Sequence, residues 1–74
     1  MKFLVEVDGD RPLVVVYEPS GEEWTLSPGH WIVVEWPNGD EGRGEIRHTP
    51  DSITLSEPLN AKSRVWDSQG NRLW

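Results

Sequence analysis

The sequence contains no cysteine among its 74 residues. This excludes disulfide bonds, thiolate zinc sites, iron–sulfur clusters and thiol nucleophiles. Basic residues are also few, with 7 Lys and Arg against 13 Asp and Glu, which gives a net charge of −6. Because affinity for nucleic acid depends on basic side chains that neutralise phosphates, we expect no nucleic-acid partner. The same charge disfavours binding to an anionic membrane surface.

The chain also has no long apolar run. Its opening stretch, residues 1–7, is interrupted by Glu6 and so differs from the apolar segment of a secretion signal. No stretch approaches the ~18 consecutive apolar residues of a membrane span. We therefore expect no membrane association and a cytoplasmic location, with which the lack of cysteine is compatible.

Tryptophan is the residue present in unusual number, with five in a chain that has room for one domain, residues 1–74. A domain of this size buries only ~60% of the surface that its unfolded chain exposes, so each large side chain matters to stability. Each large aromatic side chain buries ~150–250 Å². Several of the five tryptophans are therefore expected to complete an undersized core.

Apolar residues alternate with polar ones over short stretches that are separated by turn residues, a pattern typical of β-strands. The second and fourth of these stretches are apolar on both faces, which indicates central strands. Ser27-Pro28-Gly29-His30 has the composition of a type II turn. The expected strands are residues 2–7, 13–17, 22–26, 30–36, 45–49, a sixth around Ile53 and Leu55, and a hairpin within the C-terminal segment 57–74.

Short connections favour antiparallel pairing of consecutive strands. We therefore predict an all-β domain, a small antiparallel meander of six or seven short strands curled into a barrel or barrel-like sandwich. In this arrangement Asn38-Gly39 forms a hairpin turn between the fourth and fifth strands. Trp24 and Trp36 would then come close across the ladder and contribute to the core, whereas Trp31 would face outward.

Candidate catalytic residues are few. The Asn38-Gly39 hairpin would bring Glu35 and Glu45 side by side, a pair able to divide acid and base roles. The alternative is that both are surface residues opposite Arg43 or Arg47.

The two histidines suggest no stronger site. His48 and Asp51 could orient an imidazole or bind a metal, but no second His or carboxylate cluster completes a ligand set. His30 follows a turn and is expected at the rim. We therefore expect neither an enzyme nor a cofactor or metal site.

Binding is the better prediction, because tryptophan is enriched at interaction hot spots. We predict a small acidic, non-catalytic binding module for a protein partner, whose basic surface the acidity would attract; an inhibitor or immunity-type protein is one version. The alternative is a small ligand, a sugar or a cationic group, bound by a tryptophan patch. A homodimer, or a second small core under the C-terminal hairpin, would also cover outward tryptophans. The candidate binding residues are Trp31, Trp24, Trp36 and Trp66, and the place of Trp74 depends on how the C-terminal hairpin docks.

Overall fold

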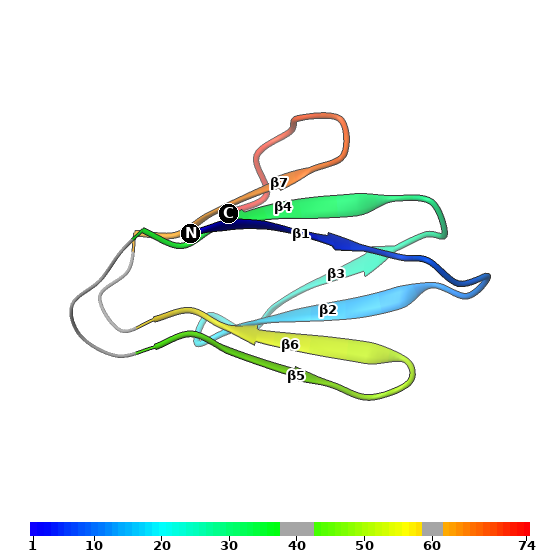
Figure 1. The fold of residues 1–74 in the computed structure, drawn as a ribbon, viewed down its shortest axis with the longest axis horizontal. Helices are drawn as coiled ribbons and strands as arrows, with labels where there is room; N and C mark the ends of the chain where they lie inside the picture. Colours follow the sequence, from blue (N-terminus) through cyan, green and yellow to red (C-terminus); the bar gives the residue numbers. More distant parts are fainter. Residues whose placement is uncertain (38–42, 59–61) are drawn as a thin grey trace.

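The computed structural model describes residues 1–37, 43–58 and 62–74, and these residues form two stacked β-sheets (Figure 1). One sheet has three antiparallel strands in the order β1-β4-β7, and the other has four strands in the order β3-β2-β6-β5. The strands are β1 (Lys2–Glu6), β2 (Leu13–Glu18), β3 (Glu22–Leu26), β4 (Trp31–Glu35), β5 (Glu45–His48), β6 (Ser52–Ser56) and β7 (Arg64–Asp67). All seven expected strand regions are therefore strands.

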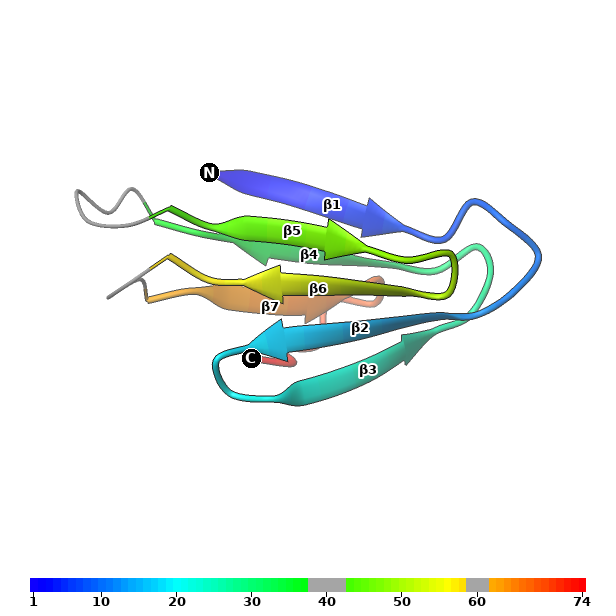
Figure 2. The same cartoon turned by 90° about the horizontal axis from the view of Figure 1, so that it is seen from below.

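The pairing of these strands corrects the predicted topology. The described strands form two open sheets rather than a closed barrel, and β2 pairs with β6 in parallel, so the four-stranded sheet is mixed. The order is not that of a meander, because β3 and β4 follow each other in sequence but lie in different sheets. Figure 2, which looks through both layers, shows β3 beside β2 at one edge of the molecule and β1 at the opposite edge. The prediction of a small all-β domain is confirmed, and its architecture is sandwich-like.

Hydrogen bonds at the end of β1 explain why β4 leaves the sheet of β3. The expected type II turn is present, with Gly29 at φ 82° and a 3.0 Å bond from the His30 N–H to the Ser27 carbonyl. Val7 binds this turn, because its carbonyl accepts from Gly29 (3.2 Å) and its N–H donates to His30 (3.1 Å). The turn therefore delivers β4 to β1 instead of returning it alongside β3.

The core lies between the two sheets and is built from the side chains on their inner faces. Alternation along each strand sends every second residue inward. The most deeply buried side chains come from both layers: Val15, Tyr17, Ile32, Val34, Leu55 and Val65. Two aromatic residues flank this group, Phe3 on β1 and Trp36 just after β4, and their rings meet edge to face at 4.9 Å. Trp36 is therefore buried because its ring lies in the core between the two sheets.

Candidate functional site: a tryptophan groove beside strand β3

Tyr17, on β2, is the hub of an aromatic cluster that collects three of the five tryptophans. Its hydroxyl accepts a 2.8 Å hydrogen bond from the Trp36 indole N–H, and its ring lies 5.6 Å from Trp24 and 5.8 Å from Trp74. Burial raises the pKa of Tyr17, against smaller opposing effects of its hydrogen bonds with Ser63 and Trp36. The cluster thus combines apolar burial with a satisfied polar group.

Trp36 belongs to the core, as expected from its place in the alternation. Only 3% of its surface is exposed, so a partner at the surface cannot reach its ring without rearrangement of the core. Trp24 and Trp36 do not meet across a ladder, because β3 and β4 lie in different sheets. Each instead contacts Tyr17. The predicted approach of the two rings across a ladder is therefore wrong, and what they share is a neighbour, Tyr17.

Trp24 and Trp31 lie on a common surface groove of about 460 Å³. The groove runs between β3 and the turn that follows β7, so its two sides come from different sheets. Leu26 and Leu73 add apolar surface, and both tryptophans are half-buried. The groove is a surface site that brings together two of the predicted binding residues.

The groove also carries polar groups at its rim. Glu23 of β3 and His30, which directly precedes β4, are exposed and line it, together with Gln69. Asp67 lines the other side, and hydrogen bonds, first of all from the Asn71 backbone, hold the pKa of its carboxyl below the usual range. Asp67 is therefore ionised at neutral pH, and the groove carries two carboxylates.

Basic residues are absent from a long stretch of the chain that includes one side of the groove. No Lys or Arg occurs between Arg11 and Arg43, a stretch that includes β2, β3 and β4. Within it, Glu18, Glu22 and Glu23 belong to β2 and β3 at their shared hairpin. We did not predict Glu23, Gln69 or Leu73 as site residues; the long stretch without basic residues is the sequence feature that could have pointed to this part of the molecule.

Trp66 does not line this groove, although it lies on the outer face of the three-stranded sheet, the face that also carries Trp31. The strand register places it in a row with Leu4 and Val33 across the three strands. Lys2 and Arg72 lie over its ring, at 5.3 Å and 5.8 Å from the centroid. These two cations cover Trp66 and leave Leu4, which is 52% exposed, as the open part of the row.

The C-terminal segment packs against the rest of the domain, and this packing fixes the position of Trp74. An isolated bridge joins Trp66 to Arg72, and the Leu73 N–H donates to the Val65 carbonyl at 2.7 Å. The ring of Trp74 rests against Tyr17, and its indole N–H donates to the Ser63 hydroxyl at 3.2 Å. The expected hairpin of the tail is therefore present, and it extends the aromatic cluster.

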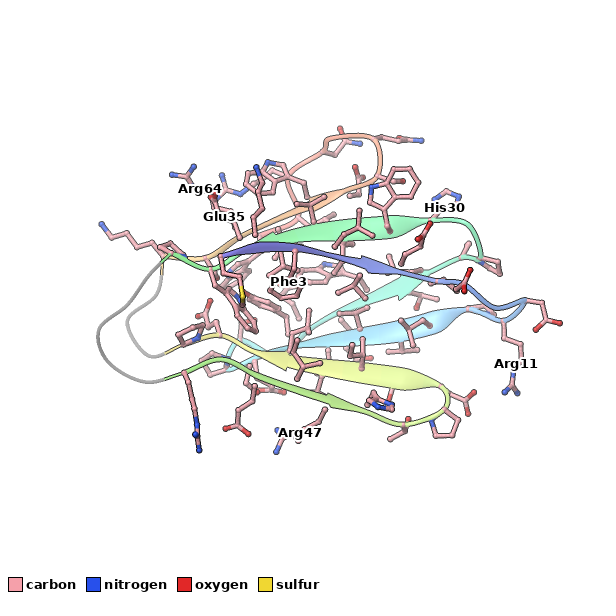
Figure 3. The ribbon with its side chains drawn as sticks, viewed as in Figure 1. Phe3, Arg11, His30, Glu35, Arg47 and Arg64 are labelled. Carbon is pink, nitrogen blue, oxygen red and sulfur yellow. The ribbon has the colours of Figure 1, made fainter. Side chains whose placement is uncertain are left out.

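The expected carboxylate pair does not form. Glu35, on β4, lies beside Arg64 on the three-stranded sheet at 3.8 Å, and Figure 3 shows both on the side of the molecule opposite Arg47. Glu45 is on β5 in the other sheet, so the two carboxylates cannot share a proton-transfer role. The Asn38-Gly39 turn on which this prediction rested lies outside the described residues.

The described residues place no set of metal ligands around His30 or His48. His30 and His48 are both exposed, and Asp51 pairs with Arg11 at 3.5 Å. Within residues 1–37, 43–58 and 62–74, no group of three His, Asp or Glu side chains is placed to hold a metal ion. The same residues include no helix of the length and apolarity that crossing a membrane requires.

Comparison of the chain with protein-family models, with curated proteins and with solved structures finds no match in any of the three. The case for a function therefore rests on the groove and the charges around it.

Proposed function

We propose that this protein is a small acidic, non-catalytic binding module whose partner is a protein with a basic surface. The observation that carries the proposal is the groove that joins Trp24 and Trp31 with the carboxylates of Glu23 and Asp67. An inhibitor or immunity-type protein that covers a basic active site is one form of this function.

The two tryptophans supply the apolar part of the proposed interface. Tryptophan is among the residues that most often carry binding energy in protein interfaces, because a large rigid ring loses little conformational entropy when it is covered. Trp31 and Trp24 are half-buried, which leaves part of each ring for a partner. Trp31 is the better anchor, because the ring of Trp24 is also packed on Tyr17.

The carboxylates supply selectivity for charge. Acidic groups on and near the groove attract a basic partner over a distance of about 8–10 Å at moderate salt and raise its association rate. A basic partner would also lower the self-repulsion of a chain that carries a net charge of −6. Binding that is strong at low salt and weak at high salt is the expected signature.

The proposal is tested by affinity capture from the source cells with four forms of the tagged protein. Wild type and Trp66→Ala should retain the same partner at low salt, since Trp66 does not line the groove and its ring is covered by Lys2 and Arg72. Trp31→Ala and Glu23→Lys should lose it, because both change the groove. Retention of the partner by the two groove variants at wild-type levels would refute the groove as the site, and capture of no specific protein at either salt concentration would refute the function.

A small cationic ligand is the second candidate, because the same groove combines two indole rings with acidic groups and is large enough for a side-chain-sized molecule. Titration with trimethyllysine and with a panel of monosaccharides, followed by tryptophan fluorescence, separates the two candidates. Saturable quenching that Trp31→Ala abolishes would favour the small ligand. An unchanged spectrum with every compound would remove it.

A further inference from the structure

Strand β3 is an open edge of the four-stranded sheet among the described residues, because its one ladder partner there is β2. Every second residue of an edge strand directs its backbone N–H and C=O away from the sheet, where they can pair with an added strand. The hydrogen bonds that β2 makes on its other side, toward β6, show which residues of β3 do so.

The hydrogen bonds of β2 identify the free groups of β3. The Val14 N–H donates to the Asp51 carbonyl at 3.2 Å, and the Glu18 carbonyl accepts from the Glu57 N–H at 3.0 Å. The even-numbered residues of β2 therefore face β6, and the odd-numbered ones face β3. Because β2 residues Val15 and Tyr17 are opposite Trp24 and Glu22, these two β3 residues bond inward. Glu23 and Thr25 consequently direct their backbone groups outward.

These free groups border the tryptophan groove. Glu23, Trp24 and Thr25 all line it, so the edge of β3 forms one wall, and the turn after β7 forms the other. Side chains of an added strand would alternate between the two faces of the sheet. Residues opposite Trp24 and Leu26 would enter the apolar part of the groove, and residues opposite Glu23 would meet its carboxylate.

We propose that β3 accepts an extended basic segment of the partner as an additional antiparallel strand, in which apolar residues face Trp24 and Leu26 and a Lys or Arg faces Glu23. This inference rests on the proposed function and specifies how the partner is held. Backbone hydrogen bonds to Glu23 and Thr25 would supply affinity, and the groove would select the side chains.

The charges of β3 favour a basic segment over a second copy of this chain. Edge strands are commonly protected by lysine, but β3 carries Glu22 and Glu23 and no basic residue. Two copies paired antiparallel through β3 would place Glu23 opposite Thr25 and gather four carboxylates at one edge with no basic residue to pair with them. A basic segment would supply the opposite charge that a second copy lacks. The other open edges differ, since β5 carries Arg47 and β1 carries Lys2.

The probe for this inference is the capped hexapeptide acetyl-Lys-Val-Lys-Val-Lys-Val-amide. In the proposed register two of its three lysines lie opposite Glu23 and Thr25, so their N–H groups bond to β3 and the valine N–H groups point away. A peptide N-methylated at the lysines should bind about tenfold more weakly or not at all. A peptide N-methylated at the valines is its matched control and should bind as the parent does.

Two protein variants and one spectroscopic readout complete the test. Glu23→Lys should weaken binding of the parent peptide roughly fivefold at low salt, whereas Glu45→Lys, the same charge change on the distant edge strand β5, should not. In amide-resolved NMR, the N–H groups of Glu23 and Thr25 should shift most and exchange more slowly with the peptide bound.

The outcomes separate this inference from the proposed function. If both methylated peptides bind like the parent, the groove takes basic segments without strand pairing, and the inference is wrong while the function stands. If the parent peptide does not bind at millimolar concentration but capture still depends on Trp31, the partner uses a folded surface and the inference is again wrong. Equal weakening by Glu23→Lys and Glu45→Lys would show an effect of net charge alone and would overturn the proposed register.

Discussion

The indole N–H of Trp36 donates a 2.8 Å hydrogen bond to the hydroxyl of Tyr17, and this bond connects the end of β4 in one sheet to β2 in the other. Both side chains are buried, so water cannot replace either partner. The bond therefore fixes how the two layers meet and places Tyr17 where it also contacts Trp24 and Trp74.

Tyr17→Phe should destabilise the fold by about 1–3 kcal/mol, because it leaves the buried Trp36 N–H without an acceptor. Urea unfolding monitored by circular dichroism measures the loss. In the double variant with Trp36→Phe, the further loss should be smaller than the single-variant costs predict, since the donor is then gone as well. Strictly additive costs for the two changes would show that the bond contributes no coupling.

Alkaline pH should destabilise the protein through the same tyrosine. Burial, the largest cause, raises the pKa of Tyr17 above its ordinary value of 10.0, so the folded state keeps a proton that the unfolded state releases. Its stabilising contribution is complete below the unfolded pKa and is lost as the pH rises through the folded pKa. Because the chain has one tyrosine, its absorbance at the phenolate band reports this ionisation directly. A Tyr17→Phe variant should show a flatter decline of stability above pH 10, and an identical decline in both proteins would contradict the assignment.

Gly44→Ala should destabilise the fold by about 1–3 kcal/mol through overpacking. A Cβ at this position would lie 2.6 Å from Cε3 of Trp36 and nearer still to Cζ3, so the ring would have to shift within the core. Gly9→Ala is the matched control, because nothing lies within 4 Å of a Cβ there. Thermal unfolding of both variants measures the difference. Equal stability of the two would mean that the Trp36 ring moves at no cost.

Asp67→Ala should loosen the C-terminal hairpin. The Asp67 carboxylate accepts from the backbone N–H groups of Gln69 (2.9 Å) and Asn71 (2.8 Å), and this stabilises the turn that ends at Gly70. The amide of Leu73 should therefore exchange with solvent faster in the variant, and hydrogen exchange followed by NMR detects this. Wild type should lose the same protection in acid, as the pH falls through the lowered pKa of Asp67. Unchanged exchange of Leu73 at neutral pH in the variant would show that the backbone hydrogen bonds to Val65 hold the tail without the carboxylate.

The local elements were predictable because their causes are local. Alternating apolar residues place the strands, and the φ of 82° that Gly29 adopts is one that glycine tolerates in a type II turn. Strand alternation also assigned Trp36 to the core. Prediction failed at the pairing of distant strands, where the parallel contact of β2 with β6 depends on residues about forty positions apart. No short-range pattern encodes such a contact.

The sequence by itself determined that the protein is a small acidic all-β domain, because composition and two-residue alternation suffice for that conclusion. Only the tertiary structure decided how the strands divide between two sheets and which tryptophans share a surface. Trp24 and Trp31 line one groove because the turn at residues 27–30 carries the chain from one layer to the other, and the turn after β7 closes the opposite side. That arrangement depends on hydrogen bonds and packing between segments far apart in the chain. Such contacts cannot be inferred from the pattern of neighbouring residues.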